Sequence, residues 1–272
     1  MTFDPSLLLQ FIIPLLLLGA LSGLLAGLLG VGGGLVLVPV LTWMLGARDV
    51  PGEALVQTAI GTAFGVILFT SISSLRAHQK TGNIKWSVVL QFTPGILLGT
   101  LIGSKIAHWI PTRELGLFFS GFIVFSAVQM LLDKKPAPSR ELPGAAGLFG
   151  VGGVIGVLSA LVGAGGGFIA VPFMAWCNVN LKSAVSTSAA MGFPIAVFST
   201  VGYVWNGWHI NGMPAGSLGY LYLPAIACLA SMSVLTAPVG ARLSQRLAVK
   251  TLKRIFAVML LILAAVMLRK VY

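Results

Sequence analysis

Long apolar runs separated by short polar stretches dominate the chain. The runs cover 7–29, 35–46, 54–75, 87–108 and 114–132, and then 145–163, 167–177, 184–205, 219–241 and 250–268. Apolar residues are continuous within each run, unlike the alternating pattern of a transmembrane β-barrel. About 20 apolar residues carry a helix across the hydrocarbon core. The pattern therefore predicts membrane-spanning helices, and the second run of each set of five is too short for a full crossing.

Composition and charge agree with a membrane protein. Hydrophobic residues make up 57% of the chain and charged residues 8%, whereas soluble domains carry about 25% charged residues. We therefore expect the lipid bilayer to be a partner. The net charge of +11 comes from basic residues in short loops, which is typical of membrane topology signals rather than of a nucleic-acid surface. We expect no nucleic-acid partner.

The two sets of five runs resemble each other in sequence. Residues Gly30–Pro39 and Gly163–Pro172 are identical at six of ten positions. Three further pairs recur 125 residues apart: Thr62 and Thr187, Ser74 and Ser199, and Gly82 and Gly207. The order of these matches predicts a tandem duplication, with a first transmembrane repeat over 1–132, a cytoplasmic linker over 133–144 and a second transmembrane repeat over 145–272.

The basic residues indicate how the repeats are oriented. If both arms of each glycine-rich segment cross the membrane, or neither does, four loops share one side and hold 12 of the 17 Lys and Arg residues: 76–86, 133–141, 178–183 and 242–254. A single crossing at each segment would instead divide the basic residues 8 to 9. The positive-inside rule favours the first arrangement. We therefore expect an all-α polytopic membrane protein made of two inverted repeats, with both termini outside.

A Gly-Xaa-Gly-Gly-Gly motif interrupts each half, and Pro39 or Pro172 follows it. Glycine adopts backbone conformations that other residues avoid, and proline removes a hydrogen-bond donor, so each half should contain a broken-helix hairpin. Irregular backbone in a membrane survives only inside protein or beside a water-filled cavity. Equivalent breaks in inverted halves indicate a midplane binding site, and the amides at helix starts favour an anion. Close helix packing is the alternative, and we expect it for Gly19, Gly23 and Gly27.

The candidate binding residues are the glycines of both breaks and the hydroxyl residues that follow them. They are Gly32, Gly33, Gly34, Thr62, Gly165, Gly166, Gly167, Thr187 and Ser188. Hydroxyls can donate to an oxyanion, although hydroxyls in spans more often bond to their own or a neighbouring helix. Lys105 and Arg242 are equivalent in the two repeats. We expect them to attract anions at the two vestibules, with snorkelling to the interface as the alternative.

The other ionisable residues favour a transporter over an enzyme. No acidic residue lies at the centre of a predicted span, although many proton- or sodium-coupled carriers use one. We place His78 and His209 in loops and His108 near a span end, without the partners of a metal site or a nucleophilic triad. The sequence also has no P-loop for an ATP-driven pump. We therefore expect no catalytic residues, no metal and no cofactor.

These motifs carry a resemblance to a known family. With the glycine motif in both halves, the segment Ala77–Trp86 and the segment Thr187–Pro194, the chain resembles the TauE/SafE family of membrane transporters over about residues 10–268. The resemblance implies export of sulfite or an organosulfonate such as sulfoacetate. It also implies that this small anion binds between Gly32–Gly34 and Gly165–Gly167, with Thr62 and Thr187 nearby.

The expected function is therefore secondary transport of a small anion by alternating access, in the bacterial cytoplasmic membrane. The membrane potential itself could drive export of an anion. An anion channel, a transporter for a different small anion and a structural membrane subunit are the alternatives. The exact anion, the coupling ion, the direction of transport and a homo-oligomeric state stay open.

Overall fold

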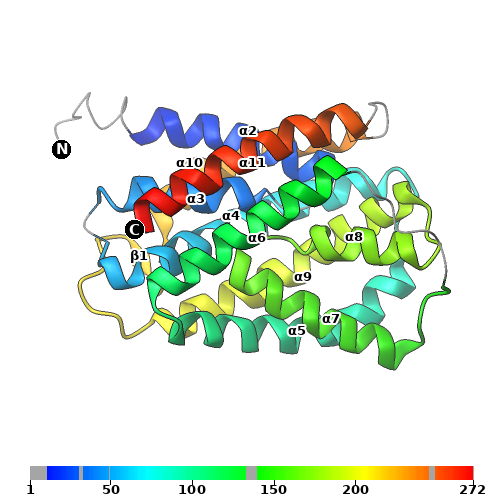
Figure 1. Cartoon of the computed structure of the whole chain (residues 1–272), viewed down its shortest axis with the longest axis horizontal. Coiled ribbons are helices and arrows are strands. Elements are labelled where there is room, and N and C mark those ends of the chain that lie inside the picture. The colour runs from blue at the N-terminus through cyan, green and yellow to red at the C-terminus, as the bar shows by residue number, and fades with distance from the viewer. Residues whose placement is uncertain (1–10, 31–32, 49, 133–139, 245–248, 272) are drawn as a thin grey trace.

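The computed structural model describes residues 11–30, 33–48, 50–132, 140–244 and 249–271, which are almost entirely helical (Figure 1). The first half contains α2 (Ile13–Leu29), α3 (Gly34–Leu45), the short 3-10 helix η2 (Gly52–Ala54), α4 (Leu55–Gln79), α5 (Trp86–Trp109) and α6 (Thr112–Leu132). The second half contains α7 (Ala145–Val162), α8 (Gly167–Trp176), α9 (Leu181–Gly207), α10 (Leu223–Ser244) and α11 (Val249–Val271). Only residues 140–144 of the expected linker are among those described.

The helices have the lengths and composition of membrane spans. Within the described residues, six are long and apolar enough to cross a membrane: α4 with η2, and α5, α6, α7, α9 and α10. The second helix of each glycine hairpin is shorter, with 12 residues in α3 and 10 in α8. At a rise of 1.5 Å per residue they extend roughly 18 and 15 Å, about half of the hydrocarbon core. The prediction that this segment is too short for a full crossing is confirmed.

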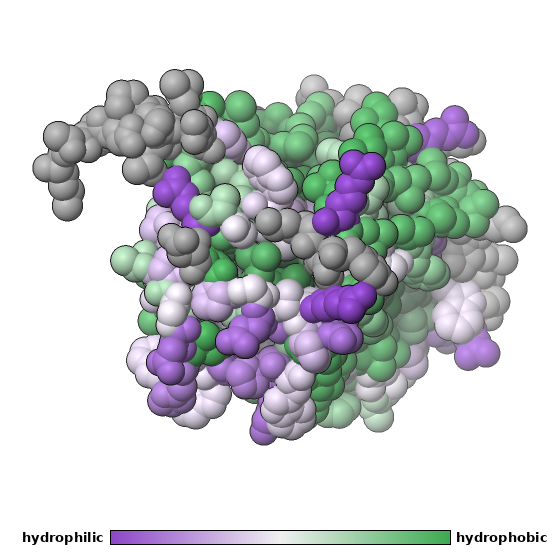
Figure 2. Space-filling model, turned by 60° about the vertical axis from the view of Figure 1, so that its left-hand side comes forward, coloured by the Kyte–Doolittle hydropathy of each residue, from purple (hydrophilic) through white to green (hydrophobic). Residues whose placement is uncertain are grey.

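The surface of the molecule is apolar where lipid would contact it. Large hydrophobic side chains such as Leu90, Phe125, Leu235 and Ile262 are exposed on the outer helices. Figure 2 shows apolar residues covering the flank of the molecule, while hydrophilic residues gather toward the end that faces forward. An exposed apolar surface of this kind is stable in lipid rather than in water. The chain is a multi-pass α-helical membrane protein.

Equivalent helices of the two halves make equivalent contacts. Helix α5 packs against α7, and its counterpart α10 packs against α2. Helices α4 and α9 contact each other in the centre, where α4 also contacts α10 and α9 also contacts α5. Helix α4 is deeply enclosed, with 83% of its most apolar stretch buried. Each half therefore covers the glycine hairpin of the other half with its own fourth span.

Small residues allow these helix pairs to approach closely. A Cβ atom added at Gly19, Gly23 or Gly27 would meet the backbone of α10 at Leu229, Ser233 and Ala237. The same contact recurs between α5 and α7, where Gly95 faces Phe149 and Gly99 faces Gly153. Close backbone approach through small residues is the common way in which membrane helices associate. The packing role predicted for the glycines of α2 is confirmed.

Two boundaries differ by four residues from the sequence prediction. The span predicted over 219–241 begins instead with a small antiparallel hairpin, β1 (Ser217–Leu218) and β2 (Leu221–Tyr222), and α10 starts only at Leu223. The positive φ of Gly219, 57°, turns the chain between these strands. The third span, predicted to end at residue 75, continues as α4 to Gln79. Residues 76–79 are more polar than the run before them but contain no helix breaker, so the helix continues beyond the end of the apolar run.

We expect the close contact between α5 and α7 to be sensitive to added volume. Gly99→Leu would force the side chain into the Gly153 backbone and should destabilise the folded protein by about 1–3 kcal/mol. Gly121→Leu is the matched control, because Gly121 on α6 is exposed and has open space around its Cα. Thermal unfolding of both purified variants in detergent measures the difference. Equal melting temperatures would contradict the packing described for this pair.

Candidate functional site

Both glycine motifs break the helix at equivalent positions. Gly30 caps the end of α2 and Gly33 precedes α3, with φ values of 67° and 73°. Gly163 caps the end of α7 and Gly166 precedes α8, with φ values of 64° and 76°. Residues with a Cβ rarely adopt this left-handed conformation, which is why glycine occupies these positions. The predicted helix breaks are confirmed.

The two breaks meet inside the protein. A Cβ atom on Gly34 would collide with the carbonyl oxygen of Gly163, so the first break lies directly against the second. Gly30 lies against Val185 on α9, and Gly163 lies against the equivalent Ile60 on α4. The core helices thus enclose backbone that lacks regular helical hydrogen bonds. This enclosure satisfies the requirement that irregular backbone in a membrane be covered by protein.

Four of the predicted glycines, Gly33, Gly34, Gly166 and Gly167, lie at the starts of α3 and α8. Of these, Gly34 lies against Gly163 of the opposite break. The carbonyl oxygen of Gly165 would lie 3.8 Å from a Cβ atom on Gly192 of α9. Gly32 lies outside the described residues. Binding of an anion by these glycines stays a prediction.

Thr62 and Thr187 hold equivalent bonds between the halves. The Thr62 hydroxyl accepts a 3.0 Å hydrogen bond from the backbone amide of Tyr222, just before α10. The Thr187 hydroxyl accepts a 3.0 Å hydrogen bond from the amide of Lys85, just before α5. Each threonine therefore fixes the start of the other half's fourth span. The hydroxyl proton is still available for another acceptor, so the predicted anion contact is compatible with this structural role.

The remaining predicted residues lie in different places. The Ser188 hydroxyl donates to the Gly30 carbonyl over 3.3 Å, directly at the first break. Lys105 and Arg242 are exposed near the ends of α5 and α10. The Lys105 ammonium lies 5.2 Å from the ring centroid of Trp109. The vestibule role of Lys105 and Arg242 stays a prediction.

The sequence analysis placed His78 in a loop, and this was wrong. His78 lies in the last turn of α4, where its side chain is fully buried. Its Nε2 lies 3.2 Å from the Gly27 carbonyl oxygen, and its Nδ1 lies 3.2 Å from the Ser186 hydroxyl. The repeat offset of 125 residues aligns His78 with the buried Tyr203, and that pairing was the signal that could have identified both residues.

Tyr203 makes the contact equivalent to that of His78. Its hydroxyl donates to the Ala160 carbonyl over 2.9 Å. Ala160 and Gly27 are themselves equivalent, because the glycine motifs are offset by 133 residues. In both halves, a side chain from the third span thus binds the last turns of the first helix of the hairpin.

Several buried hydroxyls have no hydrogen-bond partner among the described residues. They are Ser74, Ser126, Ser159, Ser199, Thr200 and Ser217. Ser74 and Ser199 are equivalent in the two repeats. Ser74 lines a cavity of about 10 Å³ beside Gly30, together with Thr70, Ser71 and Gly192. This volume fits about one water molecule, and buried hydroxyls without partners are uncommon enough to need an explanation.

Another polar contact joins the segment before α10 to the last turn of α5. The Tyr220 hydroxyl is 2.8 Å from Nδ1 of His108. Burial raises the pKa of Tyr220 to about 12, and the negative charge of Glu53 acts in the same direction. Tyr220 therefore stays neutral at physiological pH. It can hold the loop before α10 against α5.

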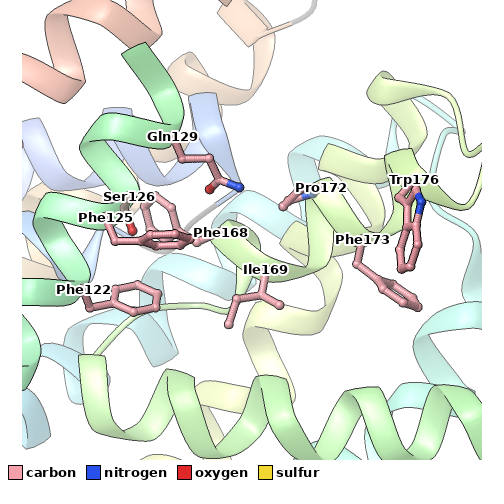
Figure 3. Close-up of a pocket in the computed structure, with 9 residues that line it drawn as sticks. All are labelled: Phe122, Phe125, Ser126, Gln129, Phe168, Ile169, Pro172, Phe173 and Trp176. Carbon is pink, nitrogen blue, oxygen red and sulfur yellow. The ribbon is translucent and has the colours of Figure 1, made fainter. Parts of the chain in front are cut away.

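A larger groove separates α6 from α8, with a volume of about 360 Å³. Figure 3 shows its aromatic lining, with Phe122 and Phe125 from α6 and Phe168 and Phe173 from α8. The Phe122 and Phe168 rings meet edge to face, with centroids 6.3 Å apart, beside the second glycine break. The equivalent helices α3 and α11 pack together directly. The two halves therefore differ at this place.

Comparison with known proteins identifies the family. The sequence profile described as "Sulfite exporter TauE/SafE" matches residues 15–267. The chain belongs to the TauE/SafE family. No group of three or more His, Cys, Asp or Glu residues that could hold a metal was found in the described part of the chain. TauE/SafE proteins are membrane transporters, so the prediction of a transporter rather than an enzyme is confirmed.

Related TauE/SafE chains carry the same general description. A "Probable membrane transporter protein" of Haemophilus influenzae is 37% identical over 262 residues, which cover 96% of this chain and 99% of that protein. One from Methanocaldococcus jannaschii is 28% identical and covers 89% of this chain and 90% of its own length. The YunE protein of Bacillus subtilis is 26% identical, with 92% and 94% covered. No solved structure matches this chain.

We expect Thr187→Val to destabilise this TauE/SafE protein, because the partly buried bond between the Lys85 amide and the Thr187 hydroxyl is lost. Loss of one intramolecular hydrogen bond costs about 0.5–1.5 kcal/mol. Thr187→Ser should restore most of the stability, since it keeps the hydroxyl. Thr42→Val is the control, because the Thr42 hydroxyl donates to the Val38 carbonyl of its own helix. Thermal unfolding of the three purified variants measures the difference. Equal stability of Thr187→Val and Thr42→Val would contradict a stabilising role for the bond between Thr187 and Lys85 of the other half.

Proposed function

We propose that this TauE/SafE protein is a secondary transporter that exports a small sulfur-containing anion, sulfite or an organosulfonate such as sulfoacetate, across the bacterial cytoplasmic membrane. The family description supports sulfur chemistry. The observation that carries the proposal is the meeting of two glycine breaks in the protein core, at Gly34 and Gly163. Amide groups at the starts of α3 and α8 would bind the anion there.

An inverted relation between the repeats supports transport through this junction. The described chain starts with α2 and ends with α11 at one end of the long axis, whereas α6 ends and α7 begins toward the other end (Figure 1). This arrangement of the chain ends supports an odd number of crossings in each half, and hence the proposal that the second half is inverted relative to the first. The basic loops around 76–86 and 178–183 belong to the linker end, which we take as the cytoplasmic side.

The difference between α6–α8 and α3–α11 supports alternating access. In inverted repeats, the two halves can exchange conformations, which opens the site to alternate sides of the membrane. The groove lies between α8 and α6, and α8 could move into it. Helix α8 would then pack against α6 in the way that α3 packs against α11. The aromatic lining disfavours the groove as a path for a small anion. We propose that it provides the space for this movement.

The membrane potential supplies a driving force for export. Moving one negative charge out of a negative interior gains about 2.3 kcal/mol per 100 mV. No acidic side chain lies in the interior of a described span, so a carboxylate for cation coupling is not part of this scheme. An anion channel is the second candidate, and it differs by showing no saturable counterflow.

Counterflow of labelled sulfite into liposomes tests the proposal directly. Purified protein should take up labelled sulfite against internal unlabelled sulfite with saturation, and sulfoacetate should compete. Flux that does not saturate would indicate a channel. An absence of flux with sulfite, sulfoacetate and thiosulfate, in protein shown to be folded, would remove sulfur-anion export as the function.

Replacing a glycine of the breaks should stop this transport. Gly166→Val would place a branched side chain against Ile195 and Ile155 at a φ of 76°, and we expect at least a tenfold loss of counterflow while the protein still inserts. Gly33→Val should act in the same way in the first half. Gly82→Val is the matched control, because Gly82 has a φ of 68° but open space around it. Wild-type flux in Gly166→Val would make the breaks packing features only.

Closing the groove should trap one conformation. In a background with Cys177 and Cys228 replaced by serine, Ser126→Cys and Ile169→Cys would place one thiol on each wall of the groove. If α8 approaches α6 during transport, oxidation should link the pair and abolish counterflow, and a reductant should restore it. The two single-cysteine variants are the controls. A pair that never links, or links without loss of flux, would contradict the proposed movement.

A further inference from the structure

His78 occupies an unusual position for a titratable group. It is the fully buried histidine among the described residues, since His108 is only partly buried and His209 is exposed. It joins three helices: α4, which carries it, α2 through the Gly27 carbonyl, and α9 through the Ser186 hydroxyl. Two of these helices belong to the first half and one to the second. A change at His78 therefore acts directly on the contact between the first glycine hairpin and the opposite repeat.

The two partners allow His78 to exist with or without an extra proton. A carbonyl oxygen only accepts, so Nε2 carries a hydrogen and donates to Gly27. In the neutral ring, Nδ1 then accepts from the Ser186 hydroxyl. In the protonated ring, Nδ1–H donates to the same oxygen, and the Ser186 proton turns elsewhere. Both states keep two hydrogen bonds, so the site is built to gain or lose a proton by rotation of one hydroxyl.

No counter-charge accompanies this buried ring in the described structure. The charged residues on the helices around it are Arg76 on α4, Lys80 directly after α4, Lys182 on α9 and Arg242 on α10, and all are exposed and basic. Helix α2 carries no charged residue between Ile13 and Leu29. A buried charge without a partner is costly. An anion arriving nearby would supply the missing negative charge.

A row of hydroxyls connects His78 to the first glycine break. Ser74 lies one helical turn before His78 on the same face of α4, and Thr70 lies one turn further. Among the described residues Ser74 has no hydrogen-bond partner, and it lines the water-sized cavity that also touches Gly30. Thr70 is bonded to Ser233 of α10 over 2.6 Å. The hydroxyl row thus runs from the buried histidine to the proposed anion site.

The second half has no such row. Tyr203, the counterpart of His78, is neutral and binds its carbonyl by donation alone. The counterparts of Thr70 and Ser71 are the apolar Ile195 and Ala196. The polar row with its titratable end belongs to the first half only, although the hydrogen bonds to the hairpin helix are retained in both. Helix anchoring alone does not require a histidine.

We propose that His78 is a proton-binding site linked to the anion site, so that one proton binds as the anion binds. This rests on the proposed function for the identity of the anion. Because linkage is reciprocal, the anion must bind more weakly as the pH rises. The neutral ring predominates in the empty transporter, and the protonated ring predominates when the anion lies next to the hydroxyl row.

Two measurements on the full chain test this, with His78→Gln and the exposed His209→Gln as matched variants. The first measurement is NMR of the protein with ring-labelled histidine, which gives few signals because the chain contains three histidines. The signal that is missing in His78→Gln belongs to His78. We expect the NMR signal of His78 to change from neutral to protonated between about pH 8 and 5. Added sulfoacetate, whose charge is constant over this range, should increase the protonated fraction.

The second measurement is the KM for sulfoacetate counterflow as a function of pH. In the wild type and His209→Gln, KM should rise by up to about tenfold per pH unit above the transition, as full coupling to one proton requires. In His78→Gln, KM should not change with pH. If His78 had a purely structural role, His78→Gln would show a lower flux at every pH. Its KM would still depend on pH as the KM of the wild type does.

The outcomes separate this inference from the proposed function. A wild-type slope in His78→Gln, or a His78 ring that stays neutral at pH 5, overturns the proton site even if sulfoacetate is transported. Absence of flux with every sulfur anion overturns the proposed function, while titration of His78 still supports the proton site. If His78→Gln does not fold, Ser186→Ala keeps the imidazole and removes one partner. It should shift the pH at which KM changes, and an unshifted profile would overturn the assignment.

Discussion

The structure depends on the covering of broken backbone in a medium that offers no hydrogen bonds. A helix interrupted inside a bilayer exposes amide and carbonyl groups, each at a cost of several kcal/mol, unless protein surrounds them. Here the two interruptions cover each other, since Gly34 lies against the Gly163 carbonyl. Each hairpin is also covered by the fourth span of the opposite half. Neither repeat could therefore place its break in the membrane alone, and the two halves form one core.

Hydrogen bonds from side chains to the backbone support the core in equivalent pairs. Thr62 and Thr187 accept from amides of the opposite half, just before α10 and α5. His78 and Tyr203 bind carbonyls of α2 and α7 within their own halves. They fix the ends of helices while the helix faces remain lined with small residues. This arrangement holds the hairpins in position.

The main features of the fold could be predicted because both hydrophobicity and the similarity of the two halves can be recognised from residue type and spacing. The ten apolar runs, the two breaks and the packing of Gly19, Gly23 and Gly27 follow from residue type and spacing. The end of α4 and the start of α10 were wrong, since apolarity marks the membrane rather than the helix. The partners of Thr62 and His78 lie 160 and 51 residues away. Contacts of this kind depend on helix rotation, which hydropathy does not specify.

Duplication also explains where chemistry could arise. Contacts that support the backbone must be retained in both halves, because each half covers the other, and Thr62, Thr187 and the glycines follow this rule. Positions that only line the core are free to differ. The first half has Thr70, Ser71 and His78 where the second has Ile195, Ala196 and Tyr203. The hydrogen bonds that hold the hairpins therefore recur in both halves, whereas the polar residues beside the first break occur in one half only.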